Sequence, residues 1–456
     1  MGEGLKEFLA SVFWMWIIWF QSCFRLIRLR FRRPAIKGSP KVLFVHKFAC
    51  YFGGGEKVLW SGVHSLVKKS PLTEVTLMAH MTCTPDELFS RLDKSFKLEF
   101  SSQMKKRISF SLLPPSLVTP APKFLFMTRL CEYLQGIAIA FFSAAEFRAS
   151  GVIFSSIVET EGAPSCTYAL KKLFKFSKVV SYVHYPFIDT KLIKSGPKGL
   201  AKLPKYIYNR LVVFLYRFFL QASDVVVANS SWSAGKVRKL LPEKSISIIF
   251  PPCNTSSFKI KGQKKPHLIS FAQFRPEKCH DFQIKLFARL LSQLKDEEKK
   301  EVKLVLVGSV RNDDDRALVQ HLQNLVSQLS LENHVEFKVN VDFQEITRIF
   351  EDSAFGIHTM KKEHFGIALV EMIAAGLVVT AWNHAGPRKD IIVESGVCGF
   401  LCSSEEEFEK NILKLFKDRF EGRMDLEEQI RENALRKRIS EFSQDAFEDK
   451  FAKLFA

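Results

Sequence analysis

The sequence predicts an α/β protein with two doubly wound domains, each a parallel sheet covered by helices on both faces. Short apolar runs recur along the chain, with helical stretches between them. Such runs are typical of strands buried on both faces, and their alternation with helices favours a mostly parallel sheet. A proline-containing passage, Phe250–Thr255, and the basic run Lys259–Lys265 interrupt the series. We therefore expect two domains joined near residues 255–265.

Each predicted strand is one of these apolar runs. They cover residues 41–46, 75–79, 151–158, 178–184 and 224–230 in the first domain, and 268–272, 303–308, a weaker 334–337, 353–358 and 377–381 in the second. The expected boundaries are an amino-terminal segment at 1–33, a first Rossmann-like domain at 34–258 and a second at 259–456, whose last helix packs back on the first domain. Sheets of this kind bind ligands at the carboxyl ends of their strands.

The amino-terminal segment predicts a membrane anchor. Phe8–Phe24 contains no charged residue, and five arginines follow between residues 25 and 33. Its seventeen residues reach the lower limit, about 17, for spanning a bilayer. The cationic flank on its carboxyl side places the rest of the chain in the cytosol. A helix lying in the membrane surface is the alternative, whereas a cleaved signal peptide would need its basic residues first.

A second apolar stretch, Tyr206–Gln221, is interrupted by Arg210 and Arg217. It fits either an interfacial helix whose arginines reach toward lipid headgroups or a helix packed in the core with exposed arginines. The apolar stretch at residues 136–145 is too short to span a membrane.

The composition narrows the classes of protein and partner. The net charge of +19, from 67 Lys and Arg against 48 Asp and Glu, predicts an acidic partner: nucleic acid, anionic lipid or a phosphorylated substrate. A hydrophobic content of 47% excludes a disordered chain. The nine cysteines form no zinc signature, so we expect no disulfide framework, no zinc module and thiols that stay reduced.

Two features at strand ends of the first domain are candidates for ligand contact. Gly53, Gly54 and Gly55 follow the first predicted strand and begin a helix near Glu56. Glycines there let a ligand approach the backbone, and the helix start offers free N–H groups to an anion, although a plain flexible turn explains them equally well. His184 ends another predicted strand and could position a reacting group, but structural histidines are more common.

In the second domain, Arg275 and Lys278 follow its first predicted strand, where a diphosphate would sit in this architecture. Two ordinary surface charges are the alternative. Further along, Glu363 and Glu371 flank Gly366 and an apolar helix that begins near that glycine. Carboxylates accept hydrogen bonds from sugar hydroxyls, so the pair could hold a hexose and a ribose. Spacing alone favours a capping acid and an ordinary helix acid instead.

Two further polar runs complete the candidate motifs. The run Asn383–Asp390 follows the last predicted strand and begins another helix. The amino-terminal end of that helix is a second position that could bind an anion. Asp313, Asp314 and Asp315 precede a helix and supply amino-terminal charge to it, so we expect no metal there.

Taken in order, these motifs resemble those of the retaining GT-B glycosyltransferases of family 4, whose two-glutamate signature corresponds to Glu363 and Glu371. More narrowly, the chain is similar to the GDP-mannose-dependent α-1,2-mannosyltransferases of asparagine-linked glycosylation. The resemblance runs from Lys41 onward and is carried by Gly53–Trp60, Tyr182–Pro186, Ser223–Trp232, Phe274–Lys278 and Glu363–Gly376.

The resemblance implies a GT-B fold, with two domains facing a central cleft, and roles for single residues. Arg275 and Lys278 would bind the donor diphosphate, Glu363 would face the mannose and Glu371 the ribose. The implied catalytic residues are His184, Arg275, Lys278 and Glu363. The implied donor-binding residues are Gly53, Gly54, Gly55, Arg275, Lys278, Glu363, Phe365, Gly366, Ile367 and Glu371. The chain departs from the family pattern at Lys57, Phe187, Asp189 and Ala385.

The implied reaction moves mannose from GDP-mannose to lipid-linked Man3GlcNAc2 with retention, adding the fourth and fifth mannoses on the cytosolic face of the endoplasmic reticulum. No metal or other cofactor is expected, because Arg275 and Lys278 supply the positive charge. The implied partners are GDP-mannose, the dolichyl-diphosphate-linked oligosaccharide, membrane lipids and other mannosyltransferases of the pathway.

Three alternatives remain beside this interpretation. One is a related family 4 transferase with another lipid acceptor, and another is a non-catalytic membrane scaffold. Nucleic-acid binding is disfavoured because the densest basic cluster adjoins an apolar segment rather than stacking aromatics.

Overall fold

The computed structural model describes residues 13, 16, 17, 20, 40–119, 128–149, 152, 154–160, 164–185, 203–258, 264–437 and 439–455. These residues form two compact units. Unit 1 contains the described parts of Met1–Asn229, together with Ser233–Ile249 and Glu448–Ala456, and unit 2 contains Ser230–Trp232 and Phe250–Phe447. Most of the predicted anchor at 8–24 lies outside the described residues, as do Phe187 and Asp189.

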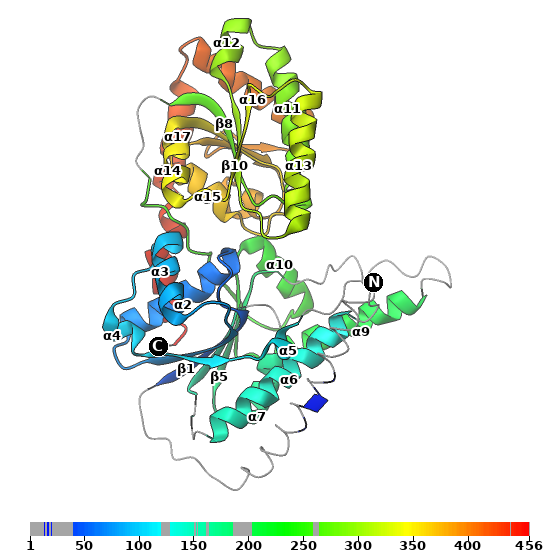
Figure 1. Cartoon of the computed structure of the whole chain (residues 1–456), viewed down its shortest axis with the longest axis vertical. Helices are drawn as coiled ribbons and strands as arrows, with labels where there is room; N and C mark the ends of the chain where they lie inside the picture. Colours follow the sequence, from blue (N-terminus) through cyan, green and yellow to red (C-terminus); the bar gives the residue numbers. More distant parts are fainter. Residues whose placement is uncertain are drawn as a thin grey trace. The chain divides into compact units, whose positions relative to one another are not determined.

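Unit 1 has a seven-stranded parallel sheet in the order β3-β2-β1-β4-β5-β6-β7 (Figure 1). The strands are β1 (Lys41–Phe48), β2 (Glu74–His80), β3 (Ile108–Leu112), β4 (Ser156–Glu159), β5 (Lys178–Val183), β6 (Val225–Ala228) and β7 (Ile246–Ile248). The helices are α2 (Gly54–Lys69), α3 (Pro85–Phe96), α4 (Ser102–Lys105), α5 (Pro115–Val118), α6 (Thr128–Ala149), α7 (Pro164–Leu173), α9 (Leu203–Gln221) and α10 (Ser231–Leu240).

The carboxyl-terminal residues Glu448–Ala456 belong to unit 1. They continue α18 (Gln444–Ala452), whose Glu448 carboxylate lies 2.7 Å from Nδ1 of His64 on α2. The Phe451 ring stacks 6.3 Å from that of Phe44 in β1. A buried hydrogen bond and an aromatic contact thus attach the end of the chain to the first strand and helix of this unit.

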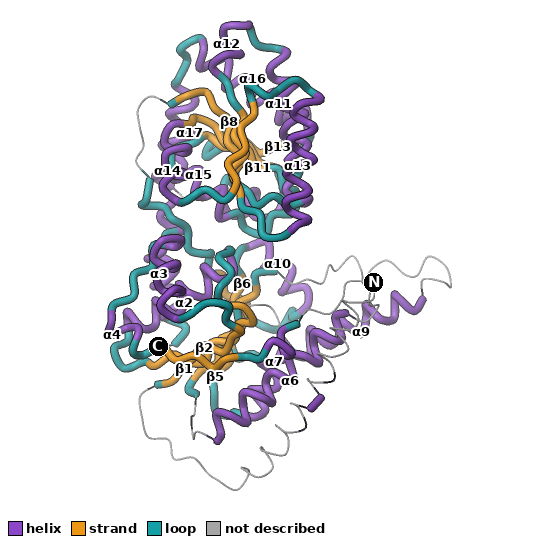
Figure 2. Tube along the Cα trace, viewed as in Figure 1, coloured by secondary structure: helices purple, strands orange, loops and turns teal. Residues whose placement is uncertain are grey.

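Unit 2 has a six-stranded parallel sheet in the order β10-β9-β8-β11-β12-β13 (Figure 2). The strands are β8 (Lys265–Phe271), β9 (Leu304–Gly308), β10 (Val335–Val339), β11 (Ser353–His358), β12 (Val378–Trp382) and β13 (Phe400–Cys402). The helical segments are η2 (Pro276–Lys278), α11 (His280–Ser292), α12 (Asp296–Glu301), α13 (Asp313–Gln328), α14 (Phe343–Asp352), α15 (Ile367–Ala374), η3 (Pro387–Ile391), α16 (Glu405–Phe420), α17 (Asp425–Lys437) and η4 (Ile439–Phe442).

The two parallel sheets with flanking helices confirm the predicted fold class. All ten predicted strands are present, and their apolar side chains form the cores on both sheet faces. Asp313 begins α13, so the prediction that the acidic run lies at a helix start is confirmed. Three edge strands, β3, β7 and β13, were not predicted. They are only three to five residues long, and β3 and β7 are partly exposed.

The prediction that all thiols stay reduced is wrong for one pair, because Cys50 and Cys83 form a disulfide. They follow β1 and β2, which are neighbouring parallel strands, so their Cα atoms lie 6.6 Å apart despite a separation of 33 residues. Sequence spacing carries no sign of this strand pairing.

Among the described residues, one helix is long and apolar enough to cross a membrane, Thr128–Phe147 within α6. It includes the ten-residue apolar stretch noted in the sequence, and 56% of it is buried. This burial is typical of a core helix, so the helix is weak evidence for a membrane span.

Candidate active site

The site in unit 2 is built at the carboxyl ends of β8 and β11. These two strands pair in parallel, although β8 ends at Phe271 and β11 begins only at Ser353. The strand order of the sheet reverses between them. Loops that leave such a reversal point diverge, which opens room for a ligand. Arg275 and Lys278 follow β8, and Glu363 follows β11.

Gly366 positions Glu363 just before helix α15. The backbone of Gly366 has a φ of +116°, a conformation that favours glycine, and the residue caps the helix that begins at Ile367. Glu363 therefore lies in the loop before the helix and Glu371 lies within the helix. This arrangement confirms the predicted helix start.

Three polar groups surround the Glu363 carboxylate. Lys278 Nζ donates to Oε2 at 2.7 Å, His358 Nε2 lies 3.1 Å from the same oxygen, and the His364 N–H donates to Oε1 at 3.1 Å. Burial alone would raise the pKa of Glu363, but the His358 hydrogen bond and the Lys278 charge outweigh it and hold that pKa far below its usual value. Glu363 is therefore ionised at neutral pH, with its oxygens oriented by three donors.

A chain of hydrogen bonds holds Lys278 in place. The Thr359 hydroxyl donates to the Lys278 carbonyl oxygen at 2.6 Å and accepts from Gln283 Nε2 at 2.7 Å. The Trp382 indole donates to the Thr359 carbonyl oxygen at 2.8 Å. Gln283 and Thr359 are buried, so these bonds are shielded from water and fix the loop that presents the lysine.

The backbone of the Glu363 loop packs directly on the segment after β12. The Gly386 N–H donates to the Glu363 carbonyl oxygen at 2.9 Å. A Cβ atom on Gly386 would stand 2.5 Å from the Phe365 carbonyl oxygen, so the close approach requires glycine. The preceding Ala385 has a φ of 52°, which explains why a glycine suits this position better than alanine.

Arg275 is half-buried and leaves β8 just before Lys278. No carboxylate of the described residues lies within ion-pair distance of its guanidinium. Glu371 is buried, with 7% of its surface exposed, and its Oε1 accepts from the Asn254 N–H at 3.2 Å. Glu371 therefore sits beside the Phe250–Thr255 passage that begins unit 2.

Phe365 differs from the expected donor-binding residues around it. Its ring is buried, 5.5 Å from that of Phe250 and 5.4 Å from that of Phe442. The side chain therefore belongs to the core, and only the backbone of Phe365 is left to contact a ligand. Ile367 is half-buried at the first position of α15.

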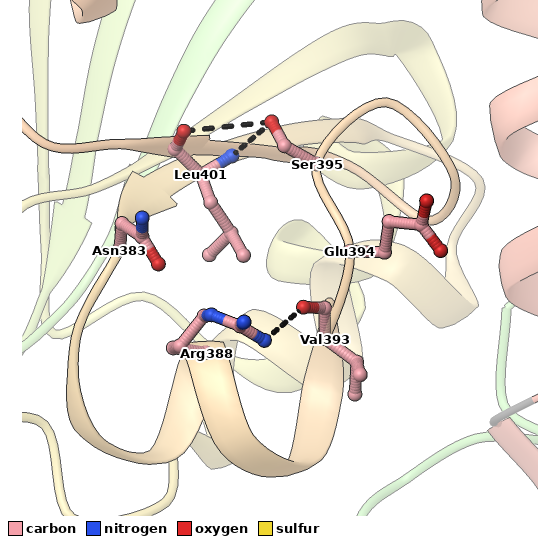
Figure 3. A pocket seen from close by; sticks show the side chains of 6 residues that line it. All are labelled: Asn383, Arg388, Val393, Glu394, Ser395 and Leu401. Atoms are coloured by element: carbon pink, nitrogen blue, oxygen red, sulfur yellow. Dashed lines mark hydrogen bonds between the residues drawn. The ribbon is translucent and has the colours of Figure 1, made fainter.

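A cavity of about 460 Å³ lies beside the run Asn383–Asp390 (Figure 3). It is lined by Asn383, Arg388, Val393, Glu394, Ser395 and Leu401. Arg388 donates to the Val393 carbonyl oxygen, and the Ser395 hydroxyl bridges the backbone of Leu401. Asn383 and Arg388 belong to the candidate anion-binding run, but none of the predicted catalytic or donor-binding residues lines this cavity. Because the Arg388 guanidinium already donates to a carbonyl oxygen, the cavity is not the candidate active site.

In unit 1 the glycine loop and His184 come together. A Cβ atom on Gly55 would stand 3.9 Å from His184 Nε2, so the loop after β1 borders the histidine that follows β5. The Gly53 N–H donates to Glu56 Oε2 at 3.0 Å, so the Glu56 carboxylate caps the amino-terminal end of its own helix, α2. Burial would raise the pKa of Glu56, but the hydrogen bond and charge of His46 keep it lowered.

Sequence reasoning missed His358 and His46. Each is buried near the carboxyl end of a central strand, and each contacts an acid or hydroxyl of the neighbouring segment: His358 contacts Glu363, and His46 Nδ1 lies 3.0 Å from the Thr160 hydroxyl. A polar residue that ends an otherwise apolar strand is the signal that could have found both. Among the described residues, no group of three His, Cys, Asp or Glu side chains could hold a metal ion.

Comparison with known proteins assigns the family. Residues 39–241 match the family described as "ALG11 mannosyltransferase N-terminus", and residues 254–437 match "Glycosyl transferases group 1". A mouse protein named GDP-Man:Man(3)GlcNAc(2)-PP-Dol alpha-1,2-mannosyltransferase is 33% identical over 91% of this chain and 86% of its own length. This chain belongs to the ALG11 mannosyltransferase family. The human and Dictyostelium discoideum proteins of the same name are 32% and 28% identical to it over similar spans.

Solved structures agree with the fold of this ALG11-family chain. The Anabaena HepE protein in complex with UDP superposes with a TM-score of 0.63 at 18% identity, over 91% of this chain and 99% of that protein. The sucrose-phosphate synthase of Thermosynechococcus elongatus gives a TM-score of 0.66 at 14% identity, over 91% and 98%. The fold is that of the GT-B glycosyltransferases.

Proposed function

We propose that this chain is the GDP-mannose-dependent α-1,2-mannosyltransferase that extends lipid-linked Man3GlcNAc2 with the fourth and fifth mannoses. Relatives named for that activity match it over 91% of its length and share its family. The observation that carries the proposal is the pairing of Lys278 with Glu363 at the reversal point of the unit 2 sheet. This pairing places a cation and an ionised carboxylate where such folds bind nucleotides.

Arg275 and Lys278 would bind the donor diphosphate and stabilise the charge that grows on it as the sugar leaves. Arg275 offers two parallel N–H groups to phosphate oxygens, whereas Lys278 offers a compact charge. Because Glu363 holds Lys278 at 2.7 Å, the ammonium is positioned before the donor arrives. The carboxylate would accept hydrogen bonds from mannose hydroxyls, and Glu371 from those of the ribose.

The proposed transfer proceeds with retention at the mannose C1. The bond between C1 and the diphosphate oxygen breaks, and the acceptor 2-hydroxyl oxygen bonds to C1 on the same face. The departing phosphate oxygen takes the hydroxyl proton, which leaves GDP and the extended glycan. His184 and the Gly53–Gly55 loop would border the reaction centre. No metal is part of this proposal, since the two cations supply the charge.

The proposed location is the cytosolic face of the endoplasmic reticulum membrane. The uncharged segment Phe8–Phe24 would anchor the chain, and the arginines after it would remain on the cytosolic side. The dolichyl-diphosphate acceptor, membrane lipids and other mannosyltransferases of the pathway are the proposed partners.

The test uses the purified full chain, GDP-mannose and Man3GlcNAc2-diphosphate-lipid, with products separated by size. We expect products one and two hexoses larger, and their loss in Glu371→Ala. An inositol lipid offered with the same donor serves as the competing acceptor. Transfer to that lipid alone would assign another acceptor to the enzyme. No extended product from the wild type, with Glu371→Ala behaving identically, would point to a non-catalytic scaffold.

A further inference from the structure

The Cys50–Cys83 disulfide lies beside the glycine loop of unit 1. Cys50 follows β1 and comes shortly before Gly53, the first residue of that loop. Cys83 follows β2 and directly precedes Thr84, the residue that caps the amino-terminal end of α3. The bond therefore ties the segment that carries the glycine loop to the start of α3, a connection that the proposed mechanism does not use.

Within the described part of the chain, hydrogen bonds hold this segment only at its two ends. At one end, the buried Trp60 indole donates to the Ala49 carbonyl oxygen at 3.1 Å. At the other, the Gly53 N–H donates to the Glu56 carboxylate. Between these points, residues 50–52 neither donate a hydrogen bond to a described residue nor accept one from it. The disulfide therefore fixes a stretch of backbone that hydrogen bonds leave unrestrained.

Aromatic contacts connect the same segment to α3. The half-buried Phe52 ring lies 5.4 Å from that of Phe96, and the Arg91 guanidinium lies 4.2 Å from the centre of the Phe52 ring. Phe52 directly precedes the glycine loop, so a change in how this segment packs on α3 moves the loop. The loop in turn borders His184, because a Cβ atom on Gly55 would stand 3.9 Å from Nε2 of that histidine.

The two sulfur atoms differ in exposure. Cys50 is buried, whereas Cys83 is half-buried and can be reached by a small molecule. In the cytosol, the proposed location of the two units, small thiols keep most disulfides reduced, and those that form usually respond to the redox state. Unit 1 also has extensive apolar cores, so its fold does not need a cross-link. A bond that opens and closes fits these observations better than a structural one.

We propose that Cys50 and Cys83 form a thiol–disulfide site that reacts with small cytosolic thiols and disulfides, such as the glutathione couple, and thereby controls the glycine loop. In the dithiol form the loop adapts to the substrates. In the disulfide form it is held on α3, and mannose transfer slows. The effect on transfer rests on the proposed function, in which this loop borders the reaction centre.

Reduction of the site takes two glutathione molecules. The thiolate of the first attacks Cys83 Sγ, the bond between the two protein sulfurs breaks, and the Cys50 thiolate leaves and takes a proton. The thiolate of the second attacks the glutathione sulfur of the mixed disulfide, which releases the Cys83 thiol and glutathione disulfide. Two electrons pass from glutathione to the protein. The reverse steps, with glutathione disulfide as the oxidant, close the bond again.

The test equilibrates the purified full chain with glutathione and glutathione disulfide at a series of ratios. Peptide mass spectrometry after alkylation measures the Cys50–Cys83 bond, and initial rates at saturating substrates measure mannose transfer. We expect kcat to fall roughly tenfold as the bond forms, because small displacements of groups around a reaction centre change rates on this scale. Hydrogen exchange of residues 49–56 should slow over the same range of ratios, because the disulfide restrains the loop.

Two variants complete the test. Cys83→Ser removes the bond and should keep the rate of the dithiol form at every ratio. Cys131→Ser is the matched control, because Cys131 is also half-buried in unit 1 but forms no disulfide, and this variant should respond like the wild type.

Three results would overturn the proposal: no bond at any ratio, a bond that forms while kcat stays constant or rises, or a Cys83→Ser enzyme that slows as much as the wild type. The absence of transfer in both redox states, beside hydrogen exchange that slows as the bond forms, would instead overturn the proposed function. The thiol–disulfide site would then remain.

Discussion

Lys278 Nζ lies 2.7 Å from Glu363 Oε2, although 85 positions separate the two residues in the sequence. The pair is largely buried, with 18% and 14% of the side chains exposed. It exists because β8 and β11 are adjacent in the sheet and both loops leave the same edge. Most of the catalytic behaviour that we expect follows from this pair and from the groups that hold it.

Removing the ammonium tests the assignment of Lys278. Lys278→Gln should lower kcat about 10²- to 10³-fold, as expected for loss of one group that stabilises charge in a transition state. Lys278→Arg keeps the charge but changes its shape, so we expect partial activity. Initial rates at saturating GDP-mannose measure both variants. A Lys278→Gln enzyme with unchanged kcat would contradict the role.

His358 is expected to act as a positioning residue through Glu363. His358→Leu removes the contact at 3.1 Å, so the carboxylate shifts and kcat falls by about 10²-fold, while the KM for the acceptor changes little. In His358→Gln, the amide nitrogen can take the place of Nε2 and should restore much of the rate. If the role of His358 is purely structural, His358→Leu and His358→Gln should lose the same thermal stability, and Gln should not restore kcat.

The low pKa of Glu363 predicts a pH-dependent contribution to stability. Because the folded-state pKa is lowered, ionisation stabilises the folded chain above the unfolded-state value of about 4.3, and this contribution is lost as pH falls below it. The melting temperature of the wild type should therefore exceed that of Glu363→Gln by a constant amount from pH 7 to pH 5. Below about pH 4.3 this difference in melting temperature should shrink. A difference that grows as the pH falls would show that the pKa of Glu363 is raised.

Substitutions at Ala385 and Gly386, which are adjacent residues after β12, should change the stability of the fold in opposite directions. Gly386→Ala would place a Cβ atom 2.5 Å from the Phe365 carbonyl oxygen, so we expect the Glu363 loop to shift and both the melting temperature and the activity to fall. Ala385→Gly relieves a φ of 52° and should stabilise the fold by up to about 1 kcal/mol without loss of activity. Equal destabilisation by both variants would contradict the described backbone contact.

The central strands could be predicted from the sequence because their apolar runs are uninterrupted. The helix start at Gly366 could be predicted as well, and with it the places of Glu363 and Glu371. The contact between Lys278 and Glu363 could not, because it depends on which strands are neighbours in the sheet. The Cys50–Cys83 disulfide and the His358 contact depend on strand pairing or loop geometry in the same way.

The most direct test of the central claim is a transfer assay with the full chain and its Glu363→Gln variant. Each is given labelled GDP-mannose and Man3GlcNAc2-diphosphate-lipid, and the product is digested with an α-1,2-specific mannosidase. The account predicts label in a glycan extended by up to two hexoses, complete release of that label by the mannosidase, and little product from the variant. Label that resists the mannosidase, or equal product from the variant, would contradict it.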